Sequence, residues 1–117
     1  MKLSANTIIA EAKITQYLLK YIPKDDKSLF LARAGYYQEN WQQLERDLRE
    51  QILPLDATLI EQTRYGDKYR IRGTLTGPNG RRLQVITIWM IESESGITKF
   101  ITLFPDKGGT NNGFRNV

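Results

Sequence analysis

The sequence predicts an α+β fold, in which N-terminal helices pack on one face of a C-terminal antiparallel sheet of about four strands, a β-meander. Apolar residues recur at helical spacing in the first half of the chain, and from Ala57 onward the period changes to that of strands. A strong hairpin signal lies between two of the strand segments. Residues 1–105 are predicted to form a single α+β domain, and the Gly- and Asn-rich residues 106–117 a loosely ordered C-terminal tail.

Two helices are predicted before Gly35. Apolar residues at helical spacing mark the first, over roughly 10–21, which ends before Pro23 because proline cannot continue a helix. The second covers residues 28–34, with Asp26 as its N-cap and Gly35 in a left-handed C-terminal cap.

A third helix follows and ends at Pro54. Asn40 or Gln38 can cap it, because a side-chain oxygen there can accept the free N–H groups of the first turn. Its buried stripe is formed by the apolar residues at helical spacing, Trp41, Leu44, Leu48 and Ile52.

The first two predicted strands cover residues 58–65 and 68–76. Leu59-Ile60 is the apolar portion of the first strand, and Gly66-Asp67 is predicted to form the tight turn after it. In the second strand, side chains alternate between the two faces of the sheet. One face carries Tyr69, Ile71, Gly73 and Leu75, and the other carries Lys68, Arg70, Arg72, Thr74 and Thr76.

Gly77-Pro78-Asn79-Gly80 is predicted to close a hairpin, because Asn-Gly accepts the positive φ that such turns need. The third strand, 83–91, is apolar on both faces, which is typical of a central strand. The last strand, 98–104, is stopped by Pro105.

Basic residues are concentrated in the second half of the chain. Residues 1–60 carry 8 Lys or Arg and 8 Asp or Glu, whereas residues 61–117 carry 9 and 5 and so supply the whole net charge of +4. A local basic patch favours an anionic partner, although solvated strand faces also carry Lys and Arg without one. The candidates for anion or nucleic-acid binding are Lys68, Arg70, Arg72, Arg81 and Arg82.

Alternate residues of a strand lie about 6–7 Å apart on one face, which matches the spacing of successive phosphates along a nucleic-acid strand. Arg70, Arg72 and Lys68 have this spacing. The aromatic residues on neighbouring segments that could stack on bases are Tyr65, Tyr69 and Trp89. The alternative is that Tyr69 and Trp89 belong to the core.

The chain contains neither cysteine nor histidine. Disulfides, zinc–thiolate sites and cysteine nucleophiles are therefore excluded, and the commonest general base is missing. The carboxylates are scattered, so no metal site is expected, and no phosphate-binding loop or dinucleotide motif predicts a cofactor. Without a signal peptide or an apolar run of membrane-spanning length, we expect a soluble cytoplasmic protein with no membrane partner.

Three residues are candidates for catalysis. Thr87 and Thr102 each interrupt an apolar segment, and if they face each other across central strands they could line a polar site. Hydrogen bonding within the sheet is the alternative explanation for both. Lys27 opens the second helix beside Asp25 and Asp26, and its alternative role is that of a solvated loop lysine.

Several motifs together resemble a known family. They are a helix containing YLL, a short helix before Gly35-Tyr36, then ENWQQLERDLREQ, YGDKYRIRGTLTGPNGR, VITIWMI and FITLFP. From about Ile8 to Pro105, the chain resembles a family of small uncharacterised bacterial proteins that is frequent in cyanobacteria. This resemblance implies no biochemical function.

Helices followed by a four-stranded antiparallel sheet, whose last strand bears a threonine and runs into a proline, also resemble the barnase–EndoU–colicin–RelE group of ribonucleases. The resemblance implies RNA cleavage by attack of the 2′-hydroxyl. The site residues that it implies are Lys27, Arg70, Arg72, Thr87 and Thr102. Many such nucleases use histidine, which this chain lacks, so the general base is unassigned.

Two hypotheses about function follow. The first is a non-catalytic domain that binds another protein or itself, which the missing His and Cys and the lack of an acid–base pair support. The second is a ribonuclease-like or RNA-binding domain that uses the basic sheet face, with a nucleic acid as partner. A sheet of about four strands also leaves two edges, so a homodimer formed by edge pairing is compatible with the sequence.

Overall fold

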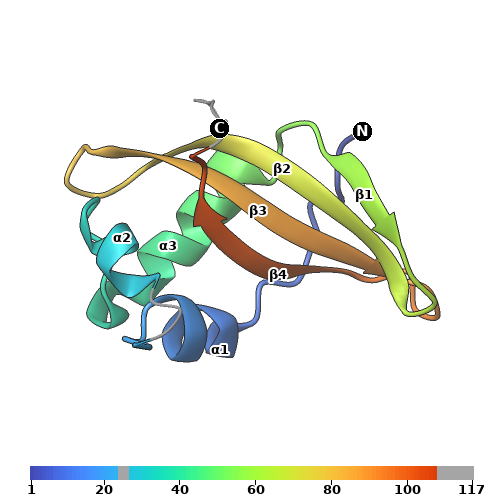
Figure 1. Cartoon of the computed structure of the whole chain (residues 1–117), viewed down its shortest axis with the longest axis horizontal. Helices are drawn as coiled ribbons and strands as arrows, with labels where there is room; N and C mark the ends of the chain where they lie inside the picture. The colour runs from blue at the N-terminus through green and yellow to red at the C-terminus, as the bar shows by residue number, and fades with distance from the viewer. Residues whose placement is uncertain (24–26, 108–117) are drawn as a thin grey trace.

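The helices and the sheet form two layers. In the computed structural model, which describes residues 1–23 and 27–107, the helices pack against one face of the sheet and leave its other face uncovered (Figure 1). The four strands follow one another in the order β1-β2-β3-β4 and are all antiparallel. The predicted α+β meander is therefore confirmed.

The described residues form six helical segments and four strands. The helical segments are α1 (Glu11–Lys13), η1 (Ile14–Leu18), α2 (Ser28–Ala32), η2 (Gln38–Asn40), α3 (Trp41–Asp47) and η3 (Leu48–Ile52). The strands are β1 (Thr58–Gln62), β2 (Gly66–Thr76), β3 (Arg82–Glu92) and β4 (Thr98–Pro105). The predicted N-cap Asp26 and the part of the predicted tail from residue 108 onward lie outside the described residues.

Two of the helices begin as α-helix and finish as π-helix. The helix formed by α1 and η1 ends with a bond from the N–H of Leu19 to the carbonyl of Ile14, 2.9 Å long. The helix formed by α3 and η3 ends in the same way, from Leu53 to Leu48 at 2.9 Å. The first helix, residues 11–18, is shorter than the predicted 10–21.

The helix caps follow local chemistry. Gly35 has a φ of 93°, which confirms the predicted left-handed residue after α2. The N–H of Tyr36 then returns to the carbonyl of Leu31 at 3.2 Å, as in a Schellman motif. The third helix begins earlier, at η2, with Tyr37 before it, and the Oδ1 of Asn40 accepts the N–H of Tyr37 at 2.7 Å. Asn40 therefore does not cap the first turn of α3 as predicted, and its side chain makes no hydrogen bond to that turn.

The long β2–β3 hairpin supplies the two inner strands of the sheet, as predicted. The pairing of β3 with β4 shifts register between Ile88 and Trp89, which marks a bulge on that side. The far edge of β4 pairs with one residue of the N-terminal segment. Ile8 donates to the carbonyl of Thr98 at 2.9 Å and accepts the N–H of Phe100 at 2.8 Å.

The turn between β1 and β2 lies earlier than predicted. It covers residues 63–65, and Gly66 is already the first residue of β2, so the predicted turn at Gly66-Asp67 is wrong. The hydroxyl of Thr63 accepts the N–H of Gly66 at 3.2 Å, which closes the turn without a glycine at positive φ. Gly66 is needed for close packing instead, because a Cβ there would lie 2.4 Å from the carbonyl oxygen of Ile91.

All five residues of β1 are exposed. The predicted apolar portion, Leu59 and Ile60, is 45% and 43% exposed. The reason is visible in Figure 1, where β1 lies at the margin of the sheet away from α1 and α2. An edge strand that the helices do not cover has no core to face.

The core fills the space between the helices and the covered face of the sheet. Trp89 is completely buried and its ring meets that of Phe100 edge to face, with 5.1 Å between centroids. Tyr69 packs against the same cluster, so neither Trp89 nor Tyr69 belongs to the uncovered face. The buried hydrophobic residues from the sheet are Ile71, Leu75, Leu83, Val85, Trp89, Phe100 and Leu103, and those from the helical segments are Ile14, Leu18, Leu31, Leu44, Leu48 and Ile52.

The tip of the β2–β3 hairpin is fixed to the end of α2. The predicted turn forms, with Gly80 at a φ of 88°. Asn79 donates its backbone N–H to the carbonyl of Ala34 at 3.3 Å and its Nδ2 to the carbonyl of Arg33 at 3.0 Å. Gly77 lies so close to Ala34 that a Cβ would be 2.1 Å from the Ala34 carbonyl oxygen.

Candidate functional site

The uncovered face of the sheet presents three cross-strand rows of side chains. Strand register places one residue each from β2, β3 and β4 in every row. The rows are Arg72 with Ile86 and Phe104, Arg70 with Ile88 and Thr102, and Lys68 with Met90 and Lys99. We call these residues the open face.

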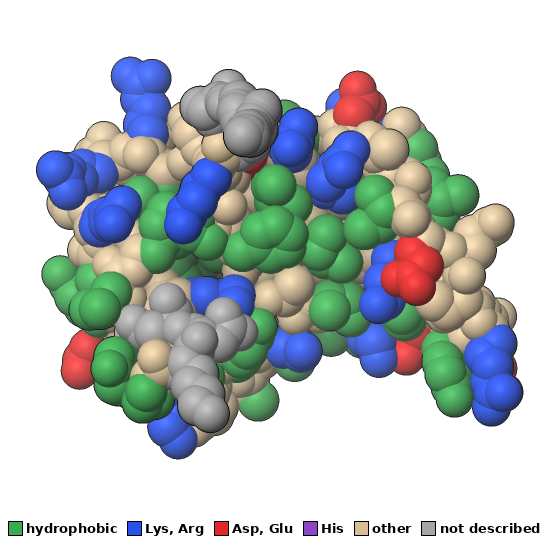
Figure 2. All heavy atoms as spheres, viewed as in Figure 1, with side chains coloured by type: hydrophobic (Ala, Val, Ile, Leu, Met, Phe, Trp, Pro, Cys, Tyr) green, Lys and Arg blue, Asp and Glu red, His purple; other side chains and the backbone are tan. Residues whose placement is uncertain are grey.

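The centre of the open face is apolar. Ile86, Ile88 and Met90 of β3 are half-buried, and Phe104 of β4 is 36% exposed. Figure 2 shows hydrophobic side chains along the middle of this face and Lys and Arg side chains at its margins. β3 is apolar on both faces, as the sequence predicts, but only one of its two faces is covered by the helices.

Three of the basic residues of the open face are paired with carboxylates. The pairs are Lys68 with Glu61 at 3.4 Å, Arg72 with Asp106 at 3.5 Å and Lys99 with Glu92 at 2.6 Å. The hydrogen bond from Lys99 lowers the pKa of Glu92 below its ordinary value. Such partly exposed pairs add little stability, but they reduce the positive potential of the face.

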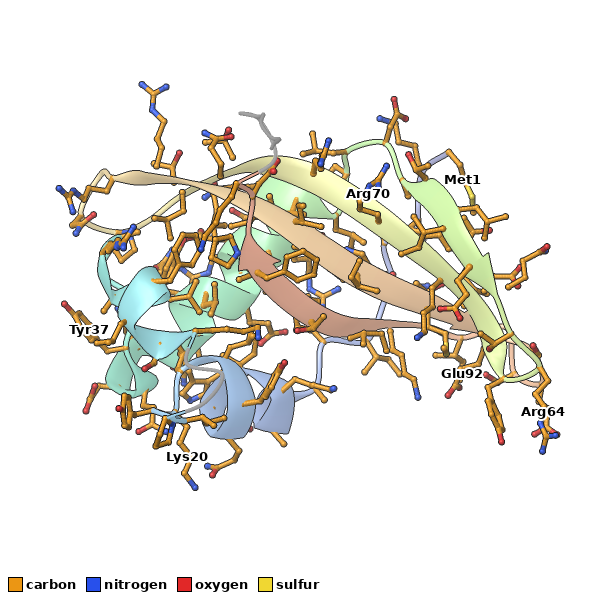
Figure 3. The ribbon with its side chains drawn as sticks, viewed as in Figure 1. Met1, Lys20, Tyr37, Arg64, Arg70 and Glu92 are labelled. Atoms are coloured by element: carbon orange, nitrogen blue, oxygen red, sulfur yellow. The ribbon has the colours of Figure 1, made fainter. Side chains whose placement is uncertain are left out.

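Arg70 differs from its neighbours. It is half-buried in the middle of β2 (Figure 3), and it forms no ion pair with residues 1–23 or 27–107. Arg81 and Arg82 are exposed at the hairpin tip and do not belong to the three rows. The predicted basic candidates therefore divide into two groups, one on the open face and one at the tip.

Lys27 and Thr102 both lie next to Tyr17 of η1, which is not among the predicted candidates. The hydroxyl of Tyr17 lies 3.1 Å from the Oγ1 of Thr102. The Nζ of Lys27 lies 5.1 Å from the centre of the Tyr17 ring, and the Nζ of Lys13 lies 5.5 Å from it. Lys27 is only 8% exposed, so it is not a solvated loop lysine.

Thr87 lies apart from this cluster, on the covered face of the sheet. Its hydroxyl donates to the carbonyl of Ile71 at 3.0 Å and accepts the Nε1–H of Trp89 at 2.7 Å. Thr87 pairs with Leu103, whereas Thr102 pairs with Ile88. The expectation that Thr87 and Thr102 face each other is wrong, because the two residues point to opposite faces of the sheet.

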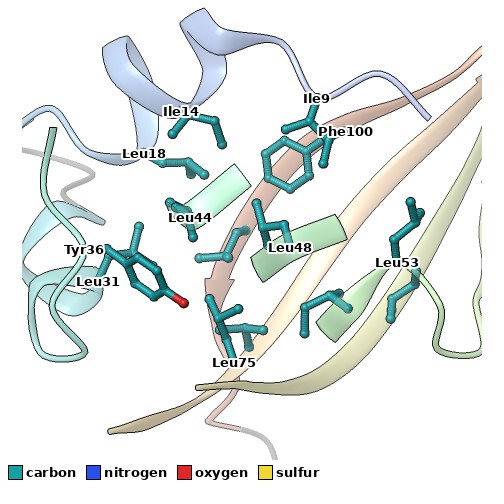
Figure 4. Packing of buried hydrophobic residues seen from close by; sticks show 14 of the residues in the cluster. Ile9, Ile14, Leu18, Leu31, Tyr36, Leu44, Leu48, Leu53, Leu75 and Phe100 are labelled. Carbon is teal, nitrogen blue, oxygen red and sulfur yellow. The ribbon is translucent and has the colours of Figure 1, made fainter. Parts of the chain in front are cut away.

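A buried polar pair was missed by the sequence argument. The hydroxyl of Tyr36 donates to the Oδ2 of Asp47 at 2.6 Å, and both residues are buried. Figure 4 shows Tyr36 beside Leu31 in the core. Burial and the neighbouring carboxylate raise the pKa of Tyr36 well above its ordinary value. Helical spacing could have predicted that Asp47 is buried, because Asp47 falls three residues after Leu44 on the buried stripe of the third helix.

Among the residues that the structure describes, no cluster of three or more Asp and Glu could hold a metal ion. None of the helices in the described ranges has the length and apolar character needed to cross a membrane.

Fold and site together define a small α+β domain, with a sheet that is covered by helices on one face and exposes an apolar strip with basic margins on the other. The chain belongs to the family DUF6883, a domain of unknown function, whose model matches residues 2–107. The expected membership of a family without an assigned function is thereby confirmed. No curated protein and no solved structure matches the chain.

Proposed function

We propose that this is a non-catalytic binding domain, whose open face binds an acidic, aliphatic segment of another protein. One observation carries the proposal: Ile86, Ile88 and Met90 stay half-exposed in the centre of a face whose margins are basic. An apolar centre inside a polar rim is the usual anatomy of a protein–protein interface.

The positive charge of the open face favours a partner with acidic side chains. Arg70 lies beside Ile88 and has no carboxylate partner among the described residues, so a carboxylate of the partner could pair with it. A second copy of the chain is a poorer occupant. Two open faces in contact would bring the basic margins, including Arg70 and Arg72, together.

The same face is less suited to nucleic acid. Phe104 is the one aromatic ring in its three rows and the other apolar residues are Ile86, Ile88 and Met90, whereas binding of single strands relies on successive aromatic rings on which bases stack. Lys68 and Arg72 already contact Glu61 and Asp106, so fewer cations remain for phosphates.

The proposal can be tested with peptides of defined sequence. A displayed library of random peptides is selected on the purified protein, and the enriched peptides are titrated by fluorescence anisotropy. We expect them to combine aliphatic residues with Asp or Glu. Ile88→Thr and Arg70→Ala should each weaken binding about tenfold or more, because the first removes an apolar contact at the centre of the open face and the second removes the cation that pairs with an acidic side chain.

The matched control is Ile97→Thr, which changes an isoleucine that is 44% exposed in the turn between β3 and β4, outside the open face. It should leave peptide affinity unchanged. Enriched peptides that lack acidic residues, or that bind Ile88→Thr as well as the wild type, would contradict the proposal.

A second candidate function is binding or cleavage of RNA by a ribonuclease-like fold. One observation favours it: Lys27, Tyr17 and Thr102 form a cluster of a cation and two hydroxyls at the margin of the open face, in line with Arg70 across the sheet. A lysine and an arginine could stabilise the charge of a phosphate under attack. The chain contains no histidine, so the general base of such a reaction is unassigned.

Incubation of the purified protein with total RNA tests this second function, with the Arg70→Ala/Arg72→Ala double variant beside the wild type. An RNA-directed domain should cleave RNA or bind it in a salt-sensitive manner, and the double variant should do so less. If the wild type neither cleaves RNA nor binds it in a salt-sensitive manner, the second candidate is eliminated.

A further inference from the structure

A separate hollow of about 510 Å³ lies where the tip of the β2–β3 hairpin meets α2 and the end of β4. It is outside the three rows of the open face. Lys and Arg side chains gather at this end of the molecule, on the left of Figure 2. The lining residues that matter here are Phe30, Arg33, Arg82, Leu83, Asp106 and Lys107.

The charge of the hollow is positive. Arg33, Arg82 and Lys107 line it, and Asp106 is the one carboxylate among the described residues that do so. Asp106 is already paired with Arg72 at 3.5 Å. Arg33 and Arg82 form no ion pair with any residue that the structure describes, so two guanidinium groups can serve an anion from outside.

The two arginines come from distant parts of the sequence, and the fold brings both to the lining of one hollow. Asn79 at the hairpin tip donates to the carbonyls of Arg33 and Ala34, at 3.0 and 3.3 Å. Gly77 lies against Ala34 with no room for a Cβ. Because these contacts fix the hairpin on α2, the backbone positions of Arg33 and Arg82 are set before any ligand arrives, which lowers the entropic cost of binding.

The rest of the hollow is apolar and includes an aromatic ring. Phe30 and Leu83 line it, and the guanidinium carbon of Arg33 lies 5.9 Å from the centre of the Phe30 ring. An arginine stacked on a ring keeps its N–H donors at the edge, where they can meet phosphate oxygens. A hollow of this size falls within the range of small-ligand pockets, about 300–1,000 Å³.

We propose that this hollow binds a phosphomonoester of about mononucleotide size. Arg33 and Arg82 hold the phosphate, and Lys107 adds positive charge beside it. The organic group lies over Phe30 and Leu83. Guanidinium groups suit this ligand because their planar set of donors contacts two phosphate oxygens at once.

Isothermal titration calorimetry of the full chain at low salt tests the proposal, with AMP as the probe and inorganic phosphate and adenosine as the comparison ligands. We expect AMP to bind about tenfold or more tightly than either, because only AMP offers both the phosphate and the organic group. Arg33→Gln and Arg82→Gln should each weaken AMP binding by about tenfold, and the double variant should abolish it. Amide resonances of Phe30 and Leu83 should shift when AMP is added.

Arg46→Gln is the matched control, because Arg46 is an exposed arginine on α3 whose side chain hydrogen-bonds, among the described residues, only to the neighbouring Gln43. It should leave AMP binding unchanged. Three results would overturn the proposal: no AMP binding by the wild type at millimolar concentration, undiminished binding by a folded double variant, or equal binding of AMP and one of the comparison ligands. Circular dichroism shows whether each variant is folded.

Discussion

The buried hydrogen bond between Tyr36 and Asp47 joins three parts of the fold. Tyr36 follows α2, Asp47 is the last residue of α3, and the Tyr36 hydroxyl also lies 3.2 Å from the carbonyl of Thr76 at the end of β2. Gln43 donates a further hydrogen bond to Asp47 at 2.9 Å. A buried carboxylate needs such donors, because leaving it without them costs far more than one ordinary hydrogen bond contributes.

Tyr36→Phe should therefore lower the free energy of unfolding at neutral pH by about 1–3 kcal/mol, as judged by urea denaturation. The loss should depend on pH. Burial, and then Asp47, raise the pKa of Tyr36 in the folded protein, so above about pH 10 the unfolded chain releases a proton that the folded protein keeps.

The unfolded state then binds fewer protons than the folded state, and the stability of the wild type falls as the pH rises. Phenylalanine has no proton to release, so the stability difference between Tyr36→Phe and the wild type should shrink between about pH 9 and about pH 11. A stability difference that stays constant over this interval would contradict a raised pKa of Tyr36 in the folded protein.

At the scale of elements, the contact between the hairpin tip and α2 fixes the sheet relative to the helices. Gly77 is buried at the contact, and its Cα faces the backbone of Ala34. Gly80 in the same turn has no atom near the place of a Cβ, and its φ of 88° is the only constraint on it. The two glycines of one turn are therefore required for different reasons, the first for close approach and the second for a left-handed backbone.

Gly77→Ala should destabilise the protein by about 2 kcal/mol or more, because the added Cβ would lie 2.1 Å from a carbonyl oxygen and the hairpin must move away from α2. Gly80→Asn is the control, since asparagine tolerates the left-handed conformation and meets no neighbour there, and it should cost less than about 1 kcal/mol. Urea denaturation measures both. Equal losses would show that the contact with Ala34 is unimportant.

At the scale of the whole molecule, the two faces of one sheet have different roles. Ile71 on the covered face is completely buried, whereas Ile88 on the open face is half-buried. Both occupy the inner strands, and both are isoleucines on a well-paired backbone. Their burial differs because the helices cover the face that carries Ile71 and leave the face that carries Ile88 uncovered.

The substitutions Ile71→Thr and Ile88→Thr make this difference measurable, because threonine keeps the β-branched shape that strands favour. Ile71→Thr should lower the free energy of unfolding by about 2–4 kcal/mol, since it removes apolar volume and buries a hydroxyl in the core. Ile88→Thr should cost less than about 1 kcal/mol, because water reaches the open face. Similar losses in urea denaturation would mean that the open face is covered in solution.

The order of helices and strands, the left-handed Gly35 after α2, and the hairpin turn at 77–80 follow from the sequence alone. They depend on periodicity and on Gly and Pro, which act over a few residues. The alternation along β2 also fixed in advance that Arg70 and Ile71 lie on opposite faces. Gly66 was misjudged because its neighbour, Ile91, is far away in sequence and near only after the strands pair.

The candidate site needed the tertiary structure for the same reason. The sequence singled out Lys27, Thr87 and Thr102, but only the packing of the first helix against β4 placed Tyr17 between Lys27 and Thr102. Only the layering of helices on one face buried Thr87 and left Ile88 open. Local patterns determine which elements form and which residues share a face. Which face becomes covered depends on contacts between segments that are far apart in the sequence, and a short stretch of sequence cannot predict the energies of those contacts.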